Sequence, residues 1–270
     1  MAVIYITNGF TQNTNIEHPE TLKVLLLNLM PNRAETEHQF VSLLKNSRRD
    51  ITLTFCLPKT HTLKNNARES LEKYATFDEI SSNYYDALIV TGAPLDRLDF
   101  ATIDYWDEFS EIVEWRKTHT QQSLFVCWSA YAAGEIEGIF KGQQLTKKIS
   151  GVYTTNELTI PHSRYFTIPL QNSIDGTIVA GSREIGAVLI QNKRLHSTYL
   201  TGHLEYQIDT LAQEYKRDSL AGLAPHKPSN YFDENNKPTD TWSATASSFY
   251  RQWLDDITEI KKSIALGRNN

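Results

Sequence analysis

The chain has 270 residues, 40% of them hydrophobic and 22% charged, with a formal net charge of −5. This length and composition are typical of a globular α/β protein, and we expect a single domain over residues 1–270 with its core at about 22–264. The negative balance, with no run of Lys or Arg longer than two, argues against nucleic acid as a partner. No apolar run approaches the ~18 residues of a membrane span, so we expect no membrane partner.

The first predicted elements are a buried strand and a helix. Residues 23–29 form a continuous apolar run, as a strand buried on both faces should. The helix that follows has Glu35 and Glu37 in its first turn, where the macrodipole favours carboxylates. Its apolar stripe comprises Phe40, Leu43 and Leu44.

The same alternation continues through the first half. Residues 51–57 show the β-branched alternation of a strand, residues 58–82 are polar and loop-like with a short helix, and residues 87–92 form a third strand. An amphipathic helix over 104–116 returns the chain to a strand that ends near residue 127. Strands and helices in this order predict a doubly wound, mostly parallel sheet of the α/β class.

The second half is predicted to extend the edge of this sheet. Three short strands punctuated by glycine are typical of a meander, and two helices follow. The strands are expected at 177–181, 187–190 and 197–200, and the helices at 209–220 and about 241–264. Residues 1–20 and 268–270 are expected to fray.

Cys127 is the candidate nucleophile. It ends an apolar strand and is followed by small residues that can open a helix, which is the pattern of a nucleophile elbow written with a thiol. The amides of a helix N-terminus favour a thiolate and can bind an oxyanion. Because the chain shows no secretory signal, we expect Cys127 and Cys56 to be reduced and the protein to be cytoplasmic.

His203 and Glu205 are the candidate partners of this thiol. A strand-like run ends just before Gly202, and side chains two apart share a face in an extended chain. Taken alone, a free cysteine is more often a small core residue, and two polar residues after a strand usually form a solvated turn. Together they lie at C-terminal strand ends, where ligands bind in open parallel sheets, so they predict a Cys-His-Glu triad.

Eight segments of the sequence, in the same order, also resemble a known family: the homoserine O-acyltransferases of the homoserine transsuccinylase type. The resemblance covers residues from about 22 to 254. The segments are LLLNLMP (25–31), IVTGAP (89–94), DYW (104–106), VCW (126–128), ISGVY (149–153), PHSR (161–164), TGHLEY (201–206) and NYF (230–232). The resemblance implies a flavodoxin-like core similar to class I glutamine amidotransferases, and ping-pong transfer of an acyl group from coenzyme A to an amino-acid hydroxyl.

The resemblance also implies roles for individual residues. It makes Cys127 the nucleophile, His203 the general base and Glu205 its orienting carboxylate, which agrees with the reading of the residues. It further implies substrate contacts, which match Lys148, Ser163 and Arg217. An Arg fork and a Lys point charge suit an amino-acid carboxylate, although such side chains on a helix or in a turn are usually only solvated.

Asp96 bears on the acyl donor. In the family, glycine at this position goes with succinyl transfer and glutamate with acetyl transfer. An anionic side chain near the acyl pocket repels the free carboxylate of a succinyl group. We therefore expect acetyl-CoA as co-substrate, with no other cofactor and no metal, and we keep succinyl-CoA as the alternative.

The acceptor stays open between L-homoserine and L-serine, and with it a place in methionine or cysteine biosynthesis. The segment between Tyr153 and Pro161 is shorter than in relatives, which suits an altered pocket, but one methylene is worth only ~1–3 kcal/mol. A cysteine hydrolase or glutamine amidotransferase using the same triad is a less favoured alternative, and a non-catalytic binding protein is the weakest. The sequence is compatible with a homodimer.

Overall fold

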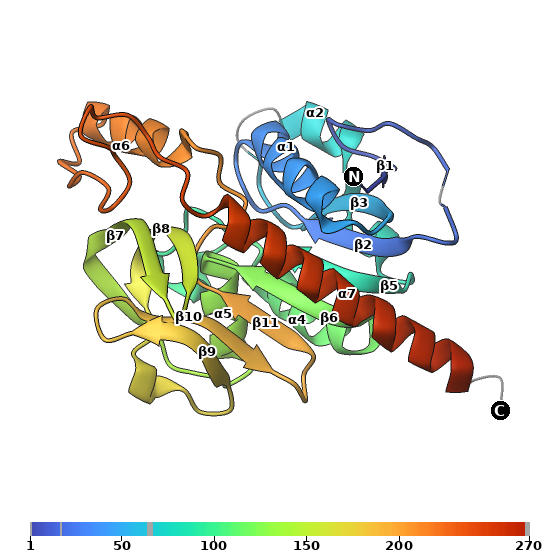
Figure 1. Cartoon of the computed structure of the whole chain (residues 1–270). Helices are drawn as coiled ribbons and strands as arrows, with labels where there is room; N and C mark the ends of the chain where they lie inside the picture. The colour runs from blue at the N-terminus through green and yellow to red at the C-terminus, as the bar shows by residue number, and fades with distance from the viewer. Residues whose placement is uncertain (1, 17, 64–66, 268–270) are drawn as a thin grey trace.

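The computed structural model describes residues 2–16, 18–63 and 67–267. Its centre is a nine-stranded sheet in the order β1-β3-β2-β5-β6-β11-β10-β9, with β4 paired to β3 (Figure 1). Pairing is parallel from β1 through β11 and antiparallel from β11 to β9. The strands are β1 (Ile4–Ile6), β2 (Leu22–Leu27), β3 (Ile51–Leu57), β4 (Ala75–Thr76), β5 (Tyr85–Val90), β6 (Thr120–Val126), β9 (Thr177–Ser182), β10 (Gly186–Asn192) and β11 (Ser197–Leu200).

Helices cover both faces of this sheet, which explains why its central strands are apolar throughout. In Figure 1, α1 (Arg33–Leu44) and α7 (Ser243–Gly267) lie on one face, and α7 runs diagonally across β5 and β6. The opposite face carries α4 (Trp106–His119) and α5 (Trp128–Ile136). The doubly wound, mostly parallel α/β sheet is therefore confirmed, and so is the antiparallel meander at its edge.

A separate hairpin stands beside the sheet. It is formed by β7 (Gln143–Thr155) and β8 (Leu158–Thr167), and the sequence analysis had not predicted it. Asn156 and Glu157 form its two-residue turn, and both have positive φ, as a type I′ turn requires. Next to the hairpin lies α6 (Thr210–Leu220), and a second apolar cluster joins the two. This cluster is made of Val152, Tyr206, Leu211, Tyr231 and Trp242.

Two expectations about the N-terminal part were wrong. Residues 4–6 do not fray, because they form the edge strand β1 and pair with β3 from Ile51 to Leu53. Glu37 does not lie in the first turn of α1, which begins at Arg33: it is fully buried further along the helix and accepts hydrogen bonds from the amides of Phe10 and Thr11 at 3.0 and 2.9 Å. The polar segment 58–82 does form a surface excursion, with two short helices and β4 in place of one helix. These helices are α2 (Ala67–Lys73) and α3 (Phe77–Ile80), and the 3-10 turns are η1 (Lys45–Ser47), η2 (Phe100–Thr102) and η3 (Leu170–Asn172).

The predicted helices α4, α6 and α7 begin and end within three residues of the expected positions. The expected fraying of residues 268–270 falls outside the described residues. In the described part of the chain, no helix is long and apolar enough to cross a membrane.

Candidate active site

Cys127 stands at a sharp turn between β6 and α5. Its backbone has φ 53° and ψ −115°, in a region that costs free energy for any residue with a Cβ and that marks nucleophile elbows. Two contacts hold the turn: the amide of Cys127 donates to the carbonyl of Leu200 at 2.7 Å, and the Ser129 hydroxyl accepts from the amide of Val126 at 2.9 Å. The elbow places the thiol at the N-cap of α5, as the sequence predicted.

Gly92 lets three strand ends come together. It follows β5, and a Cβ built on it would lie 3.3 Å from the Cβ of Cys127 and 3.3 Å from Cε1 of His203. These distances are tighter than ordinary contacts, so a side chain at this position would crowd both residues. The carboxyl ends of the neighbouring strands β5, β6 and β11 thus meet at one point. It lies at the end of the parallel sheet where ligands bind in this kind of fold.

His203 and Glu205 are joined directly. The Nδ1 atom of His203 lies 2.7 Å from Oε1 of Glu205, and both side chains are 5% exposed. The two residues lie in a turn after β11 and not in extended chain, so the expected reason for their proximity was wrong although the contact exists. Tyr206 stacks on the imidazole, with 4.2 Å between ring centroids, and fixes its plane.

Charge around His203 favours its protonated form. Burial by itself would lower the pKa of His203, but the negative charges of Cys127 and Glu205, and hydrogen bonds to both, raise it well above its usual range. The imidazole therefore lies between a thiol on one side and a carboxylate on the other. This is the arrangement in which a thiol can pass its proton to the ring.

The three residues expected to contact the substrate gather around two carboxylates of α6. Lys148 lies within β7, with Nζ 3.0 Å from Oδ2 of Asp218 and 3.6 Å from Oε2 of Glu214. The Ser163 hydroxyl donates to Glu214, and the Arg217 fork donates to Oδ1 of Asp218 at 2.9 and 2.7 Å. The structure thus brings the three together, and both cations already have a carboxylate partner.

Sequence reasoning missed these two carboxylates, although their i,i+4 spacing on α6 is a usable signal for a shared helix face. It also missed Arg164, which is fully buried in β8. Burial lowers the pKa of Arg164 to about 10, while the charges of Cys127 and Asp96 favour its cationic form. The guanidinium is held by backbone carbonyls, including that of Ile185 at 2.8 Å.

Asp96 is half-buried on the triad side of the loop after β5. Its Oδ2 accepts the amide of Tyr165 at 2.6 Å. Burial raises the pKa of the Asp96 carboxyl, while that hydrogen bond and the charges of Lys148 and His203 act in the opposite direction. The carboxyl therefore lies close enough to both the triad and the lysine to influence what binds between them.

Neither cysteine forms a disulfide: Cys56 and Cys127 are both free and buried. Burial in β3 raises the pKa of the Cys56 thiol far above its usual range, so it stays protonated. Among the described residues, no group of three or more His, Cys, Asp or Glu side chains is placed to hold a metal ion.

The fold and the site define a class of protein, the class I glutamine amidotransferase-like α/β proteins with a cysteine at the elbow. A glutamine amidotransferase from Thermotoga maritima shares the fold, with a TM-score of 0.51 at 13% identity over 90% of this chain and 98% of that one. The chain belongs to the homoserine O-succinyltransferase family, whose model matches residues 3–262.

Similar proteins within this family carry a more specific name. A protein from Leuconostoc mesenteroides named homoserine O-acetyltransferase is 42% identical over 88% of this chain and 82% of its own length. One of the same name from Lactococcus lactis subsp. lactis is 38% identical over 90% of this chain and 82% of its own length. The protein is an O-acyltransferase, as the sequence analysis expected.

Proposed function

We propose that this protein transfers the acetyl group of acetyl-CoA to the side-chain hydroxyl of L-homoserine, through an acyl intermediate on Cys127. The observation that carries the proposal is the contact of Cys127, His203 and Glu205 at the sheet edge, in a chain whose relatives are named homoserine O-acetyltransferase. A cytoplasmic location and a homodimer stay predictions.

The proposed reaction has two halves. The Cys127 thiolate attacks the thioester carbonyl, the bond between carbonyl carbon and CoA sulfur breaks, and CoA leaves as a thiol with a proton from His203. In the second half His203 takes the proton of the acceptor hydroxyl, whose oxygen attacks the acyl-cysteine. The carbon–sulfur bond to Cys127 then breaks, and the thiolate is restored. Glu205 orients the imidazole and stabilises its protonated form.

Asp96 supports acetyl-CoA as donor. Its carboxyl is close enough to Lys148 and His203 for their charges to act on it, so a succinyl group that reached the thiol would bring a second carboxylate into a partly dry site. Two like charges without counter-ions are costly there. Succinyl-CoA remains the alternative, because it is the donor after which the family is named.

The hairpin supports L-homoserine as acceptor over L-serine. The short segment that prompted the serine alternative, between Tyr153 and Pro161, forms the far end of the hairpin, with its two-residue turn after Thr155. That turn lies five ladder pairs beyond Ser163, which is about 17 Å along the strand. The shortening is thus remote from the residues expected to contact the substrate, and an acceptor pocket like that of the relatives is favoured.

The test is the release of CoA thiol from acetyl-CoA and from succinyl-CoA, each with homoserine, serine or water as acceptor. We expect the highest kcat/KM for acetyl-CoA with homoserine, and a mass increase of one acetyl group on Cys127 when the acceptor is omitted. Cys127→Ser should lose nearly all transfer while staying folded, because a hydroxyl is a far weaker nucleophile than a thiolate. An active Cys127→Ser, or transfer only to water, would contradict the proposal.

Two variants of Asp96 test the donor preference separately. Asp96→Asn keeps the volume and removes the charge, whereas Asp96→Gly removes both. Succinyl transfer that rises in both variants indicates charge repulsion, and succinyl transfer that rises only in the glycine variant indicates bulk. Donor ratios that neither variant changes would show that Asp96 does not line the acyl pocket.

A further inference from the structure

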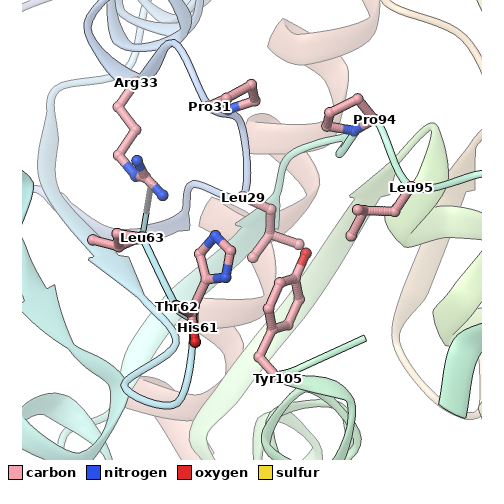
Figure 2. A pocket seen from close by; sticks show the side chains of 9 residues that line it. All are labelled: Leu29, Pro31, Arg33, His61, Thr62, Leu63, Pro94, Leu95 and Tyr105. Atoms are coloured by element: carbon pink, nitrogen blue, oxygen red, sulfur yellow. The ribbon is translucent and has the colours of Figure 1, made fainter. Parts of the chain in front are cut away.

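A pocket of about 250 Å³ is lined in part by the segment after β2 and by the loop after β5 (Figure 2). Its walls are mostly apolar, and its polar groups come from only a few side chains. The lining residues are Leu29, Pro31, Arg33, His61, Thr62, Leu63, Pro94, Leu95 and Tyr105. The residues so far assigned to chemistry or substrate contact lie outside this set.

Arg33 is a buried cation, and the described residues offer it no carboxylate partner. Its side chain extends from the start of α1 towards the pocket, as Figure 2 shows, and the residue is only 5% exposed. Within the described residues, the guanidinium has no carboxylate in an ion pair, and its Nε is buried with no hydrogen-bond partner. A buried charge normally requires compensation, and the described residues provide no carboxylate for this one.

The buried carboxylate on the same helix does not supply that compensation. Glu37 accepts from the amides of Phe10 and Thr11 and from the hydroxyls of Thr11 and Tyr74. Burial lowers the pKa of Arg33, and no carboxylate offsets this. An anion entering the pocket would provide the missing counter-charge, and the start of a helix adds amide dipoles of the right sign.

The pocket is adjacent to the nucleophile. Pro94 and Leu95 belong to the loop that begins at Gly92, the residue packed against Cys127 and His203. On the opposite wall, the Tyr105 ring contacts the edge of Trp128, the residue that follows the nucleophile, with 6.3 Å between centroids. The strand before Leu29 and Pro31, β2, is separated from β6 in the sheet by β5 alone.

We propose that this pocket is the subsite for a phosphate group of the acyl donor, with Arg33 as the residue that binds the phosphate. The inference rests on the proposed use of an acyl-CoA. A thioester bound at Cys127 must extend a flexible, largely uncharged arm away from the sulfur, and that arm leads to phosphate. The apolar walls of the pocket suit the uncharged arm, and the one buried guanidinium suits the phosphate. Arg binds phosphate bidentately.

The experiment compares donors that differ in phosphate content: acetyl-CoA, acetyl-4′-phosphopantetheine and acetyl-pantetheine, which has none. In Arg33→Gln we expect the KM for acetyl-CoA to rise about tenfold to a hundredfold, as loss of a charge-assisted contact implies, with kcat little changed. The KM for acetyl-pantetheine should stay at its wild-type value. Arg33→Lys, which keeps the charge without the fork, should fall between wild type and Arg33→Gln.

Arg68→Gln is the matched control, because Arg68 lies on α2 with a side chain that is 92% exposed, and its removal changes the net charge equally. It should leave all three KM values unchanged. A KM that rises equally for acetyl-pantetheine in Arg33→Gln, or that does not rise for acetyl-CoA, overturns the proposal. So does binding of inorganic phosphate that needs Arg33 while acetyl-CoA kinetics are unaffected, since the pocket would then hold a free anion.

Equilibrium binding of CoA itself, measured by titration calorimetry, separates this inference from the proposed function. Binding that weakens in Arg33→Gln supports the subsite even if the wild type transfers no acetyl group to homoserine. Unchanged CoA binding in Arg33→Gln, in a wild type that does acetylate homoserine, overturns the subsite and leaves the proposed function standing. Thermal unfolding of each variant checks that a weaker affinity is not a folding defect.

Discussion

The imidazole of His203 owes its protonation to two neighbours, and each can be removed. Cys127→Ala should lower the pKa of His203, because one of the two negative charges that raise it is lost while the burial that lowers it remains. Glu205→Gln should also lower it. The measurement is an NMR titration of the His203 ring nitrogens in wild type and variants.

Cys56→Ala is the control for this prediction, since it also removes a buried thiol, but one that lies in β3 and is not part of the triad. It should leave the His203 titration unchanged. If Cys127→Ala also leaves it unchanged, the thiol and the imidazole do not interact, and the proposed proton transfer from Cys127 to His203 has no basis.

At the residue scale, the triad could be predicted because each member follows a recognisable strand end. What the sequence could not supply was the set of side chains brought in from elsewhere. Glu214 and Asp218 lie beside Lys148 and Ser163 only because α6 packs next to the hairpin, whereas Arg217 pairs with its own neighbour in the chain, Asp218. Ion pairs between residues about 70 positions apart leave no local pattern. The expectation that Lys148 contacts the substrate therefore could not anticipate its carboxylate partners.

Among elements, a buried polar junction joins α4, α5 and β11. The Arg116 guanidinium pairs with Glu137, both side chains being 1% exposed, and Glu137 also accepts the Tyr199 hydroxyl at 2.5 Å. Glu137→Ala should lower the free energy of unfolding by about 3–5 kcal/mol, because it leaves the Arg116 charge buried and unpaired. Urea unfolding monitored by circular dichroism measures this.

The double variant Arg116→Met/Glu137→Leu tests the cause of that loss. Replacing both charges by apolar groups of similar volume should recover most of the stability, since no orphaned charge remains. A double variant as unstable as Glu137→Ala would mean that the junction stabilises by specific contacts, including the one to Tyr199, and not by charge compensation.

The elements that sequence patterns predicted best are those buried on both faces. The apolar runs of β2 and β5 and the β-branched alternation of β3 have few competing interpretations. The β7–β8 hairpin was missed because most of its side chains are exposed or half-buried and its turn lacks the usual Asn-Gly pair. Strand β1 was missed because three residues carry too short a pattern, and only the edge of β3 makes them a strand.

For the whole molecule, the sequence predicted the layer order but not how α7 closes the structure. The main apolar cluster runs from Ile4 in β1 to Ile257 in α7, so residues from both ends of the described chain pack together. Contacts at that sequence separation depend on the finished fold and have no local signature. A single domain over the whole chain stays a prediction, which one cooperative unfolding transition would support.

Leu254 tests the contribution of α7 to the whole fold. It is fully buried in the main apolar cluster, and Figure 1 shows α7 lying across the sheet that this cluster covers. Leu254→Ala should lower the free energy of unfolding by about 2–5 kcal/mol, through lost burial and the cavity left behind. Lys262→Ala, whose side chain is 60% exposed on the same helix, should change it by less than about 0.5 kcal/mol. Because Leu254 packs in the main apolar cluster and is not one of the triad residues, Leu254→Ala should keep the wild-type kcat at temperatures where it stays folded. A kcat that falls together with stability under those conditions would mean that α7 also positions the strand ends that carry Cys127 and His203.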